Sequence, residues 1–268
     1  RDGAEPDAAI RCPARPPPCP AGMEYVPCGP FLMGSDPGEG ESPDEEPEHV
    51  VFVSAFCIDR TEVTNGDYAG CVAERRCEPP RSRGSATRTE YFGVPEYAEF
   101  PVLHVDWGQA SAFCEWRGKA LPTEAEWEKA ARGGCEIAEP ETCGPEDERP
   151  FPWGDAWPTC ESANHAVAGC TGDADRVGAR PTGAGPYGTS DMTGNVSEWT
   201  RDRYSAGAYA ACAPSCADPS GPASGTTRVI RGGSWNYVAS NLRLTNRSDQ
   251  DPGFSGAQVG FRCAAPMR

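Results

Sequence analysis

Lysine and histidine are scarce in this chain of 268 residues, and its charge is strongly one-sided. Lys119 and Lys129 are the only lysines among 24 basic residues, and 40 acidic residues bring the net charge to −16. An acidic surface of this kind repels phosphate backbones and anionic lipids. Nucleic acid is therefore not expected as a partner, whereas divalent cations are.

Long hydrophobic runs and the usual metal-binding spacings are also missing. The longest apolar run is only a few residues, so no transmembrane helix is predicted. No C-x-x-C pair is present and the three histidines, His49, His104 and His165, are scattered, so zinc is the weaker explanation of the cysteines. No H-x₃-H pattern is present for a non-haem iron centre, and iron is not expected.

Cysteine, by contrast, is abundant: there are 14, several of them close together in polar loops rich in Gly and Pro. At this density we interpret them as a disulfide framework formed in an oxidising compartment. The chain is therefore predicted to be secreted, either extracellular or at a cell surface, with the periplasm as an alternative. Four close pairs are expected to form disulfides: Cys71–Cys77, Cys135–Cys143, Cys160–Cys170 and Cys212–Cys216.

Short apolar stretches separated by turns indicate one loop-rich domain. Residues 1–22 are rich in Pro and Ala and are predicted to form an extended N-terminal leader, and residues 23–268 to form the domain. Residues 50–58 are β-branched and aromatic and predict one strand. The seven acids between Asp36 and Glu48 predict a solvated loop, because runs of like charge are usually hydrated.

Three short helices are predicted from their start signals. In each, a Thr or Asp side chain precedes an acid or amide by three residues, as in a helix N-cap, and the last has the full capping box. Gly118 and Gly133 suit the ends of the second and third helices. The three pairs are Thr64 with Asp67, Asp106 with Gln109, and Thr123 with Glu126.

Seven segments, taken in order, carry a family resemblance. They are FLMGS (31–35), FCIDRTEVTNGDY (56–68), PVLHVDWGQASAFCEWRGKALPTEAEWEKAARGG (101–134), FPWGD (151–155), YGTSDMTGNVSEWT (187–200), RVIRGGSW (228–235) and VGFRCA (259–264). Together they resemble the sulfatase-modifying-factor family, typified by formylglycine-generating enzyme, over about residues 23–266. The resemblance implies an α+β, loop-rich fold with low regular secondary structure, a variant of the C-type lectin fold with bound calcium.

The resemblance also implies copper-dependent oxidation of a substrate cysteine, with the copper held by two cysteines between RGGS and GFRCA. Here that segment, residues 235–259, contains no cysteine. Tyr237, Ala239 and Leu242 cannot replace thiolates as ligands of Cu⁺. Copper and formylglycine formation are therefore not expected.

The turn in YGTSDMTGNVSEW is the stronger of two candidates for calcium. The resemblance implies ligands from the side chains of Asp191 and Glu198 and from the carbonyl oxygens of Gly194 and Val196. Hard cations bind several oxygens, and a tight turn presents carbonyl groups beside carboxylates. The alternative is an acidic turn capped by its own backbone.

A second calcium site is implied in the loop before this turn. Asn164 and the backbone of His165 fit its first half, and Asp173 or Asp175 fits its second half. The loop between them carries Cys170 and differs in length from that of the family. One or two calcium sites are therefore expected.

The family further implies a long-range disulfide between Cys114 in AFCEW and Cys263 in GFRCA. Four cysteines remain after this pair and the four close pairs, and sequence alone leaves three ways to join them. They are Cys12, Cys19, Cys28 and Cys57.

A second resemblance concerns RGGSWNYVASNLRLTNR and the later GFR, which are similar to the C-terminal segment of lectin-fold binding proteins diversified by retroelements. In those proteins the residues after GGSW form an exposed, variable binding face. Tyr, Asn and Ser suit adaptable recognition surfaces. The alternative is a segment that merely closes the fold. The corresponding residues here are Asn236, Tyr237, Ser240, Asn241, Arg243 and Asn246.

Together these observations predict a secreted, disulfide-rich, calcium-binding and non-catalytic binding or structural domain. Its partner is expected to be another extracellular protein or a glycan. One alternative is an enzyme of the same family with different chemistry, although no nucleophile–base pair stands out in the sequence. The other is a maturation factor for another exported protein.

Overall fold

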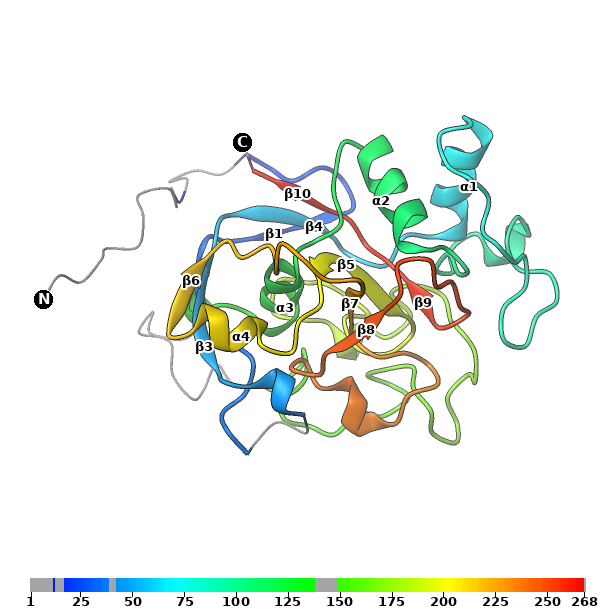
Figure 1. Cartoon of the computed structure of the whole chain (residues 1–268). Helices are drawn as coiled ribbons and strands as arrows, with labels where there is room; N and C mark the ends of the chain where they lie inside the picture. The colour runs from blue at the N-terminus through cyan, green and yellow to red at the C-terminus, as the bar shows by residue number, and fades with distance from the viewer. Residues whose placement is uncertain (1–11, 13–16, 39–41, 138–148, 268) are drawn as a thin grey trace, which may run out of the picture.

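The computed structural model describes Cys12 and residues 17–38, 42–137 and 149–267. Within these residues short strands form three small sheets, and much of the chain runs in loops and turns (Figure 1). The α+β, loop-rich fold predicted from the sequence is therefore confirmed.

The first sheet brings together strands from both ends of the domain, because β1 and β10 flank β4 as antiparallel neighbours. Its strands are β1 (Met23–Val26), β4 (Phe56–Asp59) and β10 (Ala264–Pro266). The second sheet comprises β2 (Gly29–Met33), β3 (His49–Val53) and β6 (Ser215–Ala217), and β6 runs parallel to β3. The third has the order β8 (Ser248–Gln250), β7 (Arg228–Arg231), β5 (Ser197–Arg203) and β9 (Val259–Gly260).

The three predicted helices are confirmed, and their caps have the predicted partners. They are α1 (Asn65–Ala73), α2 (Trp107–Trp116) and α3 (Glu124–Arg132). Thr64 caps α1, and both α2 and α3 begin with a complete capping box. Gly133 ends α3 with a φ of 99°, a conformation that favours glycine.

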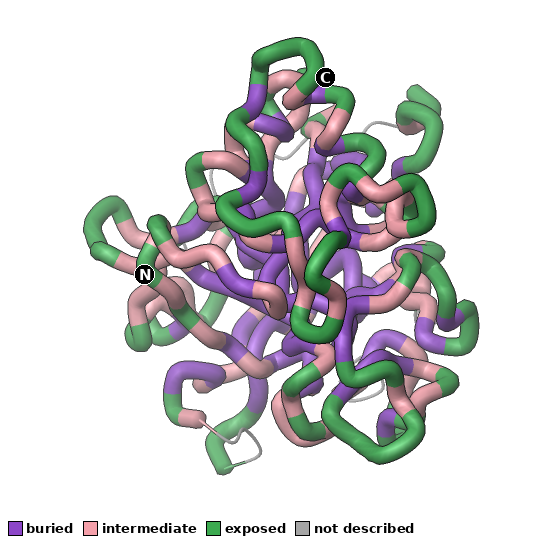
Figure 2. Tube along the Cα trace, turned by 90° about the vertical axis from the view of Figure 1, so that its right-hand side faces the viewer, coloured by how far each residue is buried: buried purple, intermediate pink, exposed green. Residues whose placement is uncertain are grey.

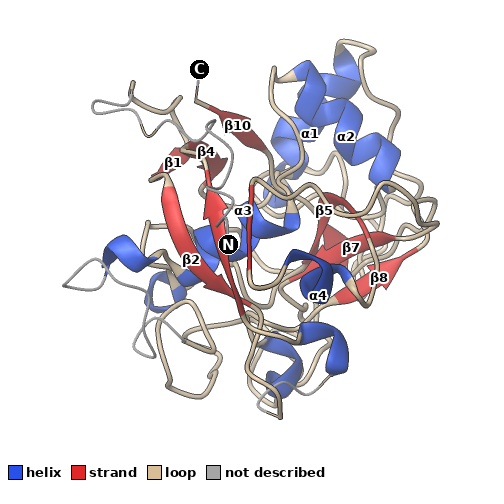
Figure 3. Cartoon of the chain, turned by 60° about the vertical axis from the view of Figure 1, so that its left-hand side comes forward, coloured by secondary structure: helices blue, strands red, loops and turns tan. Residues whose placement is uncertain are grey.

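Shorter helical segments lie in the connections. A brief helix α4 (Ala208–Cys212) precedes β6, and α3 lies between the first two sheets on one side and the third on the other (Figure 3). Single 3₁₀ turns occur at η1 (Pro43–Glu45), η2 (Pro95–Tyr97), η3 (Cys135–Ile137), η5 (Pro181–Gly183) and η6 (Ala239–Leu242).

The prediction of one strand over residues 50–58 is wrong. The segment contributes β3 and β4 to two different sheets, separated at Ser54 and Ala55. Asp218 accepts hydrogen bonds from the backbone N–H and the hydroxyl group of Ser54, both at 2.7 Å. The backbone N–H of Ser54 thus donates to a side chain and not to a neighbouring strand. The chain leaves the second sheet and enters the first at this point.

The acidic run before β3 is not solvated throughout, which corrects a second prediction. Asp44 and Glu45 lie in η1 and are buried. Both oxygens of Glu45 accept from Arg243, at 2.7 and 2.9 Å, and Oε2 also accepts from Thr245 at 2.7 Å. A hydrogen-bonded arginine more than 190 residues away in sequence makes burial of this carboxylate tolerable.

The disulfides follow the predicted framework where the structure describes both partners. Cys71–Cys77, Cys160–Cys170, Cys212–Cys216 and Cys114–Cys263 are all present. The open pairing is resolved as Cys12–Cys28 and Cys19–Cys57, which attach the segment before β1 to the domain. Cys143 and most of the predicted leader (residues 1–11 and 13–16) lie outside the described residues, so the Cys135–Cys143 pair stays a prediction.

Two large hydrophobic clusters make up most of the interior. One surrounds Trp127 of α3 and includes residues of the first two sheets, and the other surrounds Trp199 of β5 beside α1 and α2. Both indole rings are fully buried. Figure 2 shows the buried segments at the centre and the exposed loops around them. Aromatic rings therefore supply much of the core that regular layers supply in other folds.

Candidate functional site

The predicted calcium turn lies directly before β5 and is buried. Asp191 and Asn195 have left-handed backbone conformations, with φ of 55° and 59°, and Gly194 has a φ of 80°. The turn reverses the chain so that Asp191 and Glu198 are both buried, with 8% and 1% of their surface exposed. Burying two carboxylates close together in sequence requires a compensating charge or hydrogen bonds.

Glu198 receives that compensation from Arg262, in the GFRCA segment. Glu198 Oε2 accepts from Arg262 Nε at 2.7 Å, and Oε1 accepts from Arg262 Nη2 at 2.7 Å. The indole N–H of Trp127 donates to Oε2 at 2.9 Å. Arg262 and Trp127 therefore converge on this carboxylate, and a bidentate arginine already balances its charge.

Asp191 instead lies beside another buried carboxyl group, that of Glu62. Asp191 accepts a hydrogen bond from the backbone N–H of Gly178 at 2.5 Å. Burial raises the pKa of Asp191, although this hydrogen bond and the charge of Arg262 lower it. Burial, with repulsion from Asp191, holds the pKa of Glu62 well above its ordinary value. Sequence analysis did not select Glu62, although it lies in the EVTN segment that carried the resemblance.

Glu62 has one buried oxygen that no N–H or hydroxyl group reaches. Asn195 Nδ2 donates to Glu62 Oε1 at 2.9 Å, whereas Oε2 accepts from no such donor in the described structure and its carboxyl group lies within hydrogen-bonding reach of that of Asp191. An orphaned carboxylate oxygen beside a second carboxylate and a turn rich in carbonyl groups fits a hard cation. Asp191, with the backbone of Gly194 and Val196, would hold the calcium, and Glu62 would offer a further oxygen.

The second predicted calcium site is differently arranged. Asp173 Oδ2 accepts from Ser85 Oγ and Thr87 Oγ1, both at 2.6 Å, and lies 2.9 Å from Arg88 Nη1. Although burial alone would raise the pKa of Asp173, hydrogen bonds from Ser85 and Thr87 hold it below its ordinary value. Asp175 pairs with Arg180 at 2.8 Å. Protein donors thus already occupy the carboxylates at this position.

The remaining residues of that set are linked through Asn195. Asn164 donates to the backbone carbonyl of Asp173 at 2.9 Å and to Asn195 Oδ1 at 3.1 Å. Because Asn195 also binds Glu62, it joins the two predicted sites into one buried hydrogen-bond network. The ring of His165 lies apart, with Nδ1 3.9 Å from the sulfur of Cys170.

The predicted ligand face is only partly exposed. Asn236 is exposed, and the other five positions are half-buried. Arg243 is held in its two-oxygen contact with Glu45, and Ser240 donates to Asn241 at 3.1 Å. Tyr237 packs against the hydrophobic cluster of Phe151. These residues therefore present a rigid surface and not a set of free side chains.

Exposed hydrophobic side chains lie in this segment and in two loops that meet it. Trp157, Val238 and Val167 have 62%, 57% and 50% of their surface exposed. Phe151 stacks on Trp153 with ring centroids 5.4 Å apart and meets Trp157 edge-on at 5.9 Å. We call this surface the aromatic face, and it consists of Trp153, Trp157, Val167, Tyr237 and Val238.

The backbone also joins the two segments of the aromatic face. The N–H of Ala166 donates to the carbonyl oxygen of Tyr237 at 2.8 Å. Tyr237 was predicted from the sequence as part of a binding face, but Trp157 and Val167 were not. The dense aromatic residues of FPWGDAW were the available signal, but only the tertiary structure shows which of these rings is exposed.

Comparisons with known proteins agree with this architecture. The family described as the sulfatase-modifying factor enzyme 1-like domain matches residues 12–267. The chain belongs to this family. The structure of PvdO from Pseudomonas aeruginosa shares the fold, with a TM-score of 0.72 and 27% identity over 91% of this chain and 94% of that one.

Sequence relatives of this family member carry different names. Formylglycine-generating enzyme from Thermomonospora curvata is 33% identical over 293 residues, covering 91% of this chain and 93% of that protein. Inactive C-alpha-formylglycine-generating enzyme 2 from Mus musculus is 30% identical over 292 residues, covering 91% and 85%. Family membership alone therefore does not decide whether this chain is an enzyme.

A third relative is much longer than this chain. Serine/threonine-protein kinase pkn1 from Chlamydia caviae is 34% identical over 257 residues, and the match covers 92% of this chain but only 38% of that protein. The kinase name thus describes a protein of which this chain spans well under half. In the described part of the chain, every helix is too short or too polar to cross a bilayer.

Proposed function

We propose that this member of the sulfatase-modifying-factor family is a secreted, non-catalytic binding protein that recognises another exported protein or a glycan through its aromatic face. The observation that supports this most directly is that Trp157, Val167 and Val238 are exposed on segments that meet around Phe151 and Tyr237. They are three of the four large hydrophobic side chains that the described residues leave exposed. Such a group on a surface that is otherwise strongly acidic is typical of an interaction site.

The construction of the aromatic face suits recognition. Trp and Tyr provide large contact areas and lose little side-chain entropy on binding. Phe151 packs against both Trp153 and Trp157, and the Cys160–Cys170 disulfide restrains the loop between them and Val167. A surface that is ordered before binding loses less entropy when a partner binds.

The absence of the copper ligands supports a non-catalytic role. Residues 235–259 contain no cysteine, and the side chain of Leu242 is fully buried in the cluster of Phe151. Neither it nor the phenol of Tyr237 offers Cu⁺ the soft sulfur ligands that it prefers. A relative of similar length carries the word "inactive" in its name.

Calcium is proposed as the structural ion at the turn of Asp191. The unpaired oxygen of Glu62, the adjacent carboxyl group of Asp191 and the carbonyl groups of the turn support this assignment. Calcium would offset the repulsion between the two acids and order the turn that connects to β5. We do not extend the proposal to Asp173, because protein donors already surround that carboxylate.

The binding proposal is tested by comparing two exposed hydrophobic residues. Trp157→Ala should weaken binding of an exported protein or glycan at least tenfold, because a central Trp often contributes more than about 1.4 kcal/mol to an interface. Ile137→Ala is the matched control, since Ile137 is 39% exposed but is not part of the aromatic face. Partners are found by glycan array and by cross-linking to exported proteins. Equal affinity of the two variants for every partner found would contradict the proposal.

A maturation activity is the second candidate, because a named formylglycine-generating enzyme is 33% identical over 91% of the chain. A peptide with the C-x-P-x-R signature of sulfatases, incubated with the protein, copper and O₂, should keep its mass if the chain is non-catalytic. Repeated turnover, detected as loss of the thiol mass from the peptide, would favour the enzyme.

A further inference from the structure

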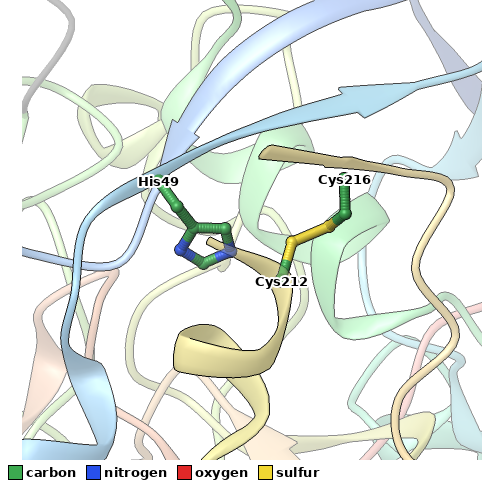
Figure 4. Close-up of side chains that lie close together, drawn as sticks. All are labelled: His49, Cys212 and Cys216. Carbon is green, nitrogen blue, oxygen red and sulfur yellow. A yellow bond between two sulfur atoms is a disulfide. The ribbon is translucent and has the colours of Figure 1, made fainter. Parts of the chain in front are cut away.

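Three potential metal ligands from distant parts of the chain lie together beside β3. His49 is the first residue of this strand, Cys216 lies in the neighbouring strand β6, and Cys212 ends α4 (Figure 4). One ligand atom of each lies within 4.8 Å of the other two. The two sulfur atoms form a disulfide whose cysteines are four residues apart in sequence.

The imidazole ring of His49 is held in the form that a metal requires. Nδ1 lies 2.9 Å from the carbonyl oxygen of Pro47, and since a carbonyl group only accepts, Nδ1 carries the proton. Nε2 therefore keeps its lone pair, and Figure 4 shows the other side of the ring turned toward the disulfide. Histidine ligands of metals commonly donate their second N–H to a carbonyl group in this way.

The surroundings keep the imidazole ring neutral and fixed. The ring is 4% exposed and packs on Tyr209, with ring centroids 5.0 Å apart. Burial lowers the pKa of His49, which favours the neutral ring. A neutral ring without rotational freedom binds a metal without first losing a proton or conformational entropy.

A pocket gives access to these three side chains. It has a volume of about 280 Å³, and its walls include His49, Cys212 and Cys216 together with Met33 and Ala208. Both cysteines are half-buried, unlike Cys114 and Cys263, which are fully buried. A reductant or a metal ion can therefore reach this disulfide while the core disulfide stays protected.

We propose that reduction of the Cys212–Cys216 disulfide creates a metal site, in which both thiolates and Nε2 of His49 bind a d¹⁰ ion, either Zn²⁺ or Cu⁺. Thiolates and imidazole are the ligands that these ions prefer. The site is independent of the proposed calcium and of the aromatic face. It also lies outside residues 235–259, where the family resemblance places copper.

The reaction that opens the site is thiol–disulfide exchange with a dithiol reductant. One thiolate of the reductant attacks a sulfur of the Cys212–Cys216 bond and forms a mixed disulfide, and its second thiol then displaces the remaining cysteine. The reductant becomes a disulfide, and two electrons and two protons pass to Cys212 and Cys216. Metal binding then releases those two protons.

The geometry of the opened site is feasible. Metal–sulfur bonds of about 2.3 Å place the two sulfurs about 4 Å apart in trigonal or tetrahedral coordination. The Cα atoms of Cys212 and Cys216 are already 5.3 Å apart, so side-chain rotation can supply the required change. The pocket leaves room for water as a further ligand.

The chain contains a natural control for this site. The Cys160–Cys170 disulfide also lies near a histidine, since Nδ1 of His165 is 3.9 Å from the sulfur of Cys170. Among the described residues, however, these three do not form a compact ligand set of the kind made by His49 and its two cysteines. Reduction of this second disulfide should therefore create no comparable site.

The first test combines limited reduction with metal binding. A phosphine reductant is added in steps, and alkylation with peptide mapping identifies the opened disulfides. Cys212–Cys216 should open before Cys114–Cys263. After anaerobic removal of the reductant, one Zn²⁺ or Cu⁺ per chain should bind against a competing chelator, and the two ions are compared in separate arms. Co²⁺ should produce a thiolate-to-cobalt charge-transfer band.

Variants assign the metal to these side chains. The double variant Cys212→Ser/Cys216→Ser should lose the bound ion and the cobalt band, whereas Cys160→Ser/Cys170→Ser should keep both. His49→Gln should weaken binding at least tenfold. If His49→Gln fails to fold, the cysteine variants and the wild-type cobalt spectrum still decide. The proposal is overturned if Cys212–Cys216 resists reduction until the protein unfolds, if the reduced protein binds neither ion, or if Cys212→Ser/Cys216→Ser binds as well as wild type.

Discussion

Two regions of this protein bury clusters of carboxylates, and they balance the charge differently. On the buried face of α3, Glu124 accepts from Arg231 at 2.8 Å and from Arg247 at 2.7 and 2.8 Å. At the turn before β5, the buried arginines near Asp191 already pair with other acids, Arg262 with Glu198 and Arg180 with Asp175.

The pKa values of the buried glutamates Glu124 and Glu62 shift in opposite directions, because arginines balance the first and not the second. Burial alone would raise both values, but the charges of Arg247 and Arg231 hold the pKa of Glu124 below its ordinary value. The pKa of Glu62 is raised well above its ordinary value, because a neighbouring carboxyl group adds to the effect of burial. The α3 cluster is thus balanced by the protein's own side chains, whereas the turn fits an added cation.

The largest loss of stability is expected from removing a carboxylate of the α3 cluster, whose charges the arginines already balance. Glu128→Ala removes the carboxylate that pairs with Arg132 at 2.9 Å and with Arg231. Both buried guanidinium groups then lose an ion-pair partner. Loss of one partner from a buried pair should lower the free energy of unfolding by about 3–5 kcal/mol. Urea denaturation measures this change.

The matched control for that variant is an exposed helical glutamate. Glu115 of α2 is exposed, and Glu115→Ala should change the free energy of unfolding by no more than about 0.5 kcal/mol. Equal losses in Glu128→Ala and Glu115→Ala would contradict the view that the α3 cluster depends on its buried charges.

At the turn, calcium should balance the charge of the buried carboxylates, as Arg231 and Arg247 do at α3. At a hundredfold excess over its Kd, calcium should stabilise the native state by about 2.7 kcal/mol. The melting temperature should therefore fall in chelator and recover with Ca²⁺ but poorly with Mg²⁺, which prefers a tighter octahedron. Scanning calorimetry measures both. Asp191→Ala should remove most of the shift, and an unchanged wild-type melting temperature in chelator would refute the site.

Asp202 allows a test of pH dependence in the α3 region. It accepts from the backbone N–H of Glu124 at 3.0 Å, and burial, with repulsion from Glu124, raises its pKa from 3.8 to about 7. Between these values the native carboxyl group keeps a proton that the unfolded one has lost, so the contribution of Asp202 to stability should fall as the pH rises from 5 to 7. The expected slope is about 1.4 kcal/mol per pH unit.

The difference between wild type and Asp202→Asn, measured by denaturation in saturating calcium, isolates this contribution of Asp202. The wild-type advantage should shrink as the pH rises from 5 to 7, because only the wild type titrates at this position, whereas the three histidines titrate in both proteins. The direction is opposite to that of Glu124, whose lowered pKa contributes stability that is lost only as the pH falls below about 4.5. A difference that stays constant or grows between pH 5 and 7 would show that the native carboxyl group of Asp202 is ionised throughout.

The smallest effect is expected from neutralising Glu62. Glu62→Gln removes one of two adjacent buried acids, so in chelator it should raise the free energy of unfolding by about 1 kcal/mol. The same variant should reduce the calcium-dependent shift, because a neutral amide oxygen binds a cation more weakly than a carboxylate. Thermal melts with and without calcium measure both changes. Loss of stability in chelator would indicate that the native turn needs the charge of Glu62.

Local features of the fold could be predicted because local sequence determines them. The three helices begin where Thr64, Asp106 and Thr123 offer a capping oxygen to the first turn. The close cysteine pairs could be assigned because few residues separate their members. The boundary between β3 and β4 could not, since it depends on Asp218, more than 160 residues farther along the chain.

The candidate site was predicted in part. Asp191 and Glu198 were selected through the family resemblance, and both are buried at the turn. Their partners were not selected, because Arg262 and Glu62 reach the turn from other strands and loops. Likewise Tyr237 was selected on its segment, whereas the exposure of Trp157 depends on how the loop around it packs.

Sequence by itself determined the family, the acidic surface, the disulfide-rich character and the lack of cysteines where a family copper site would require them. Tertiary structure alone decided which buried acids are paired, which aromatic rings are exposed, and that His49 lies beside Cys212 and Cys216. The physical reason is that caps and short disulfide loops involve neighbouring residues, whereas charge balance, exposure and metal geometry depend on groups that only the completed fold brings together.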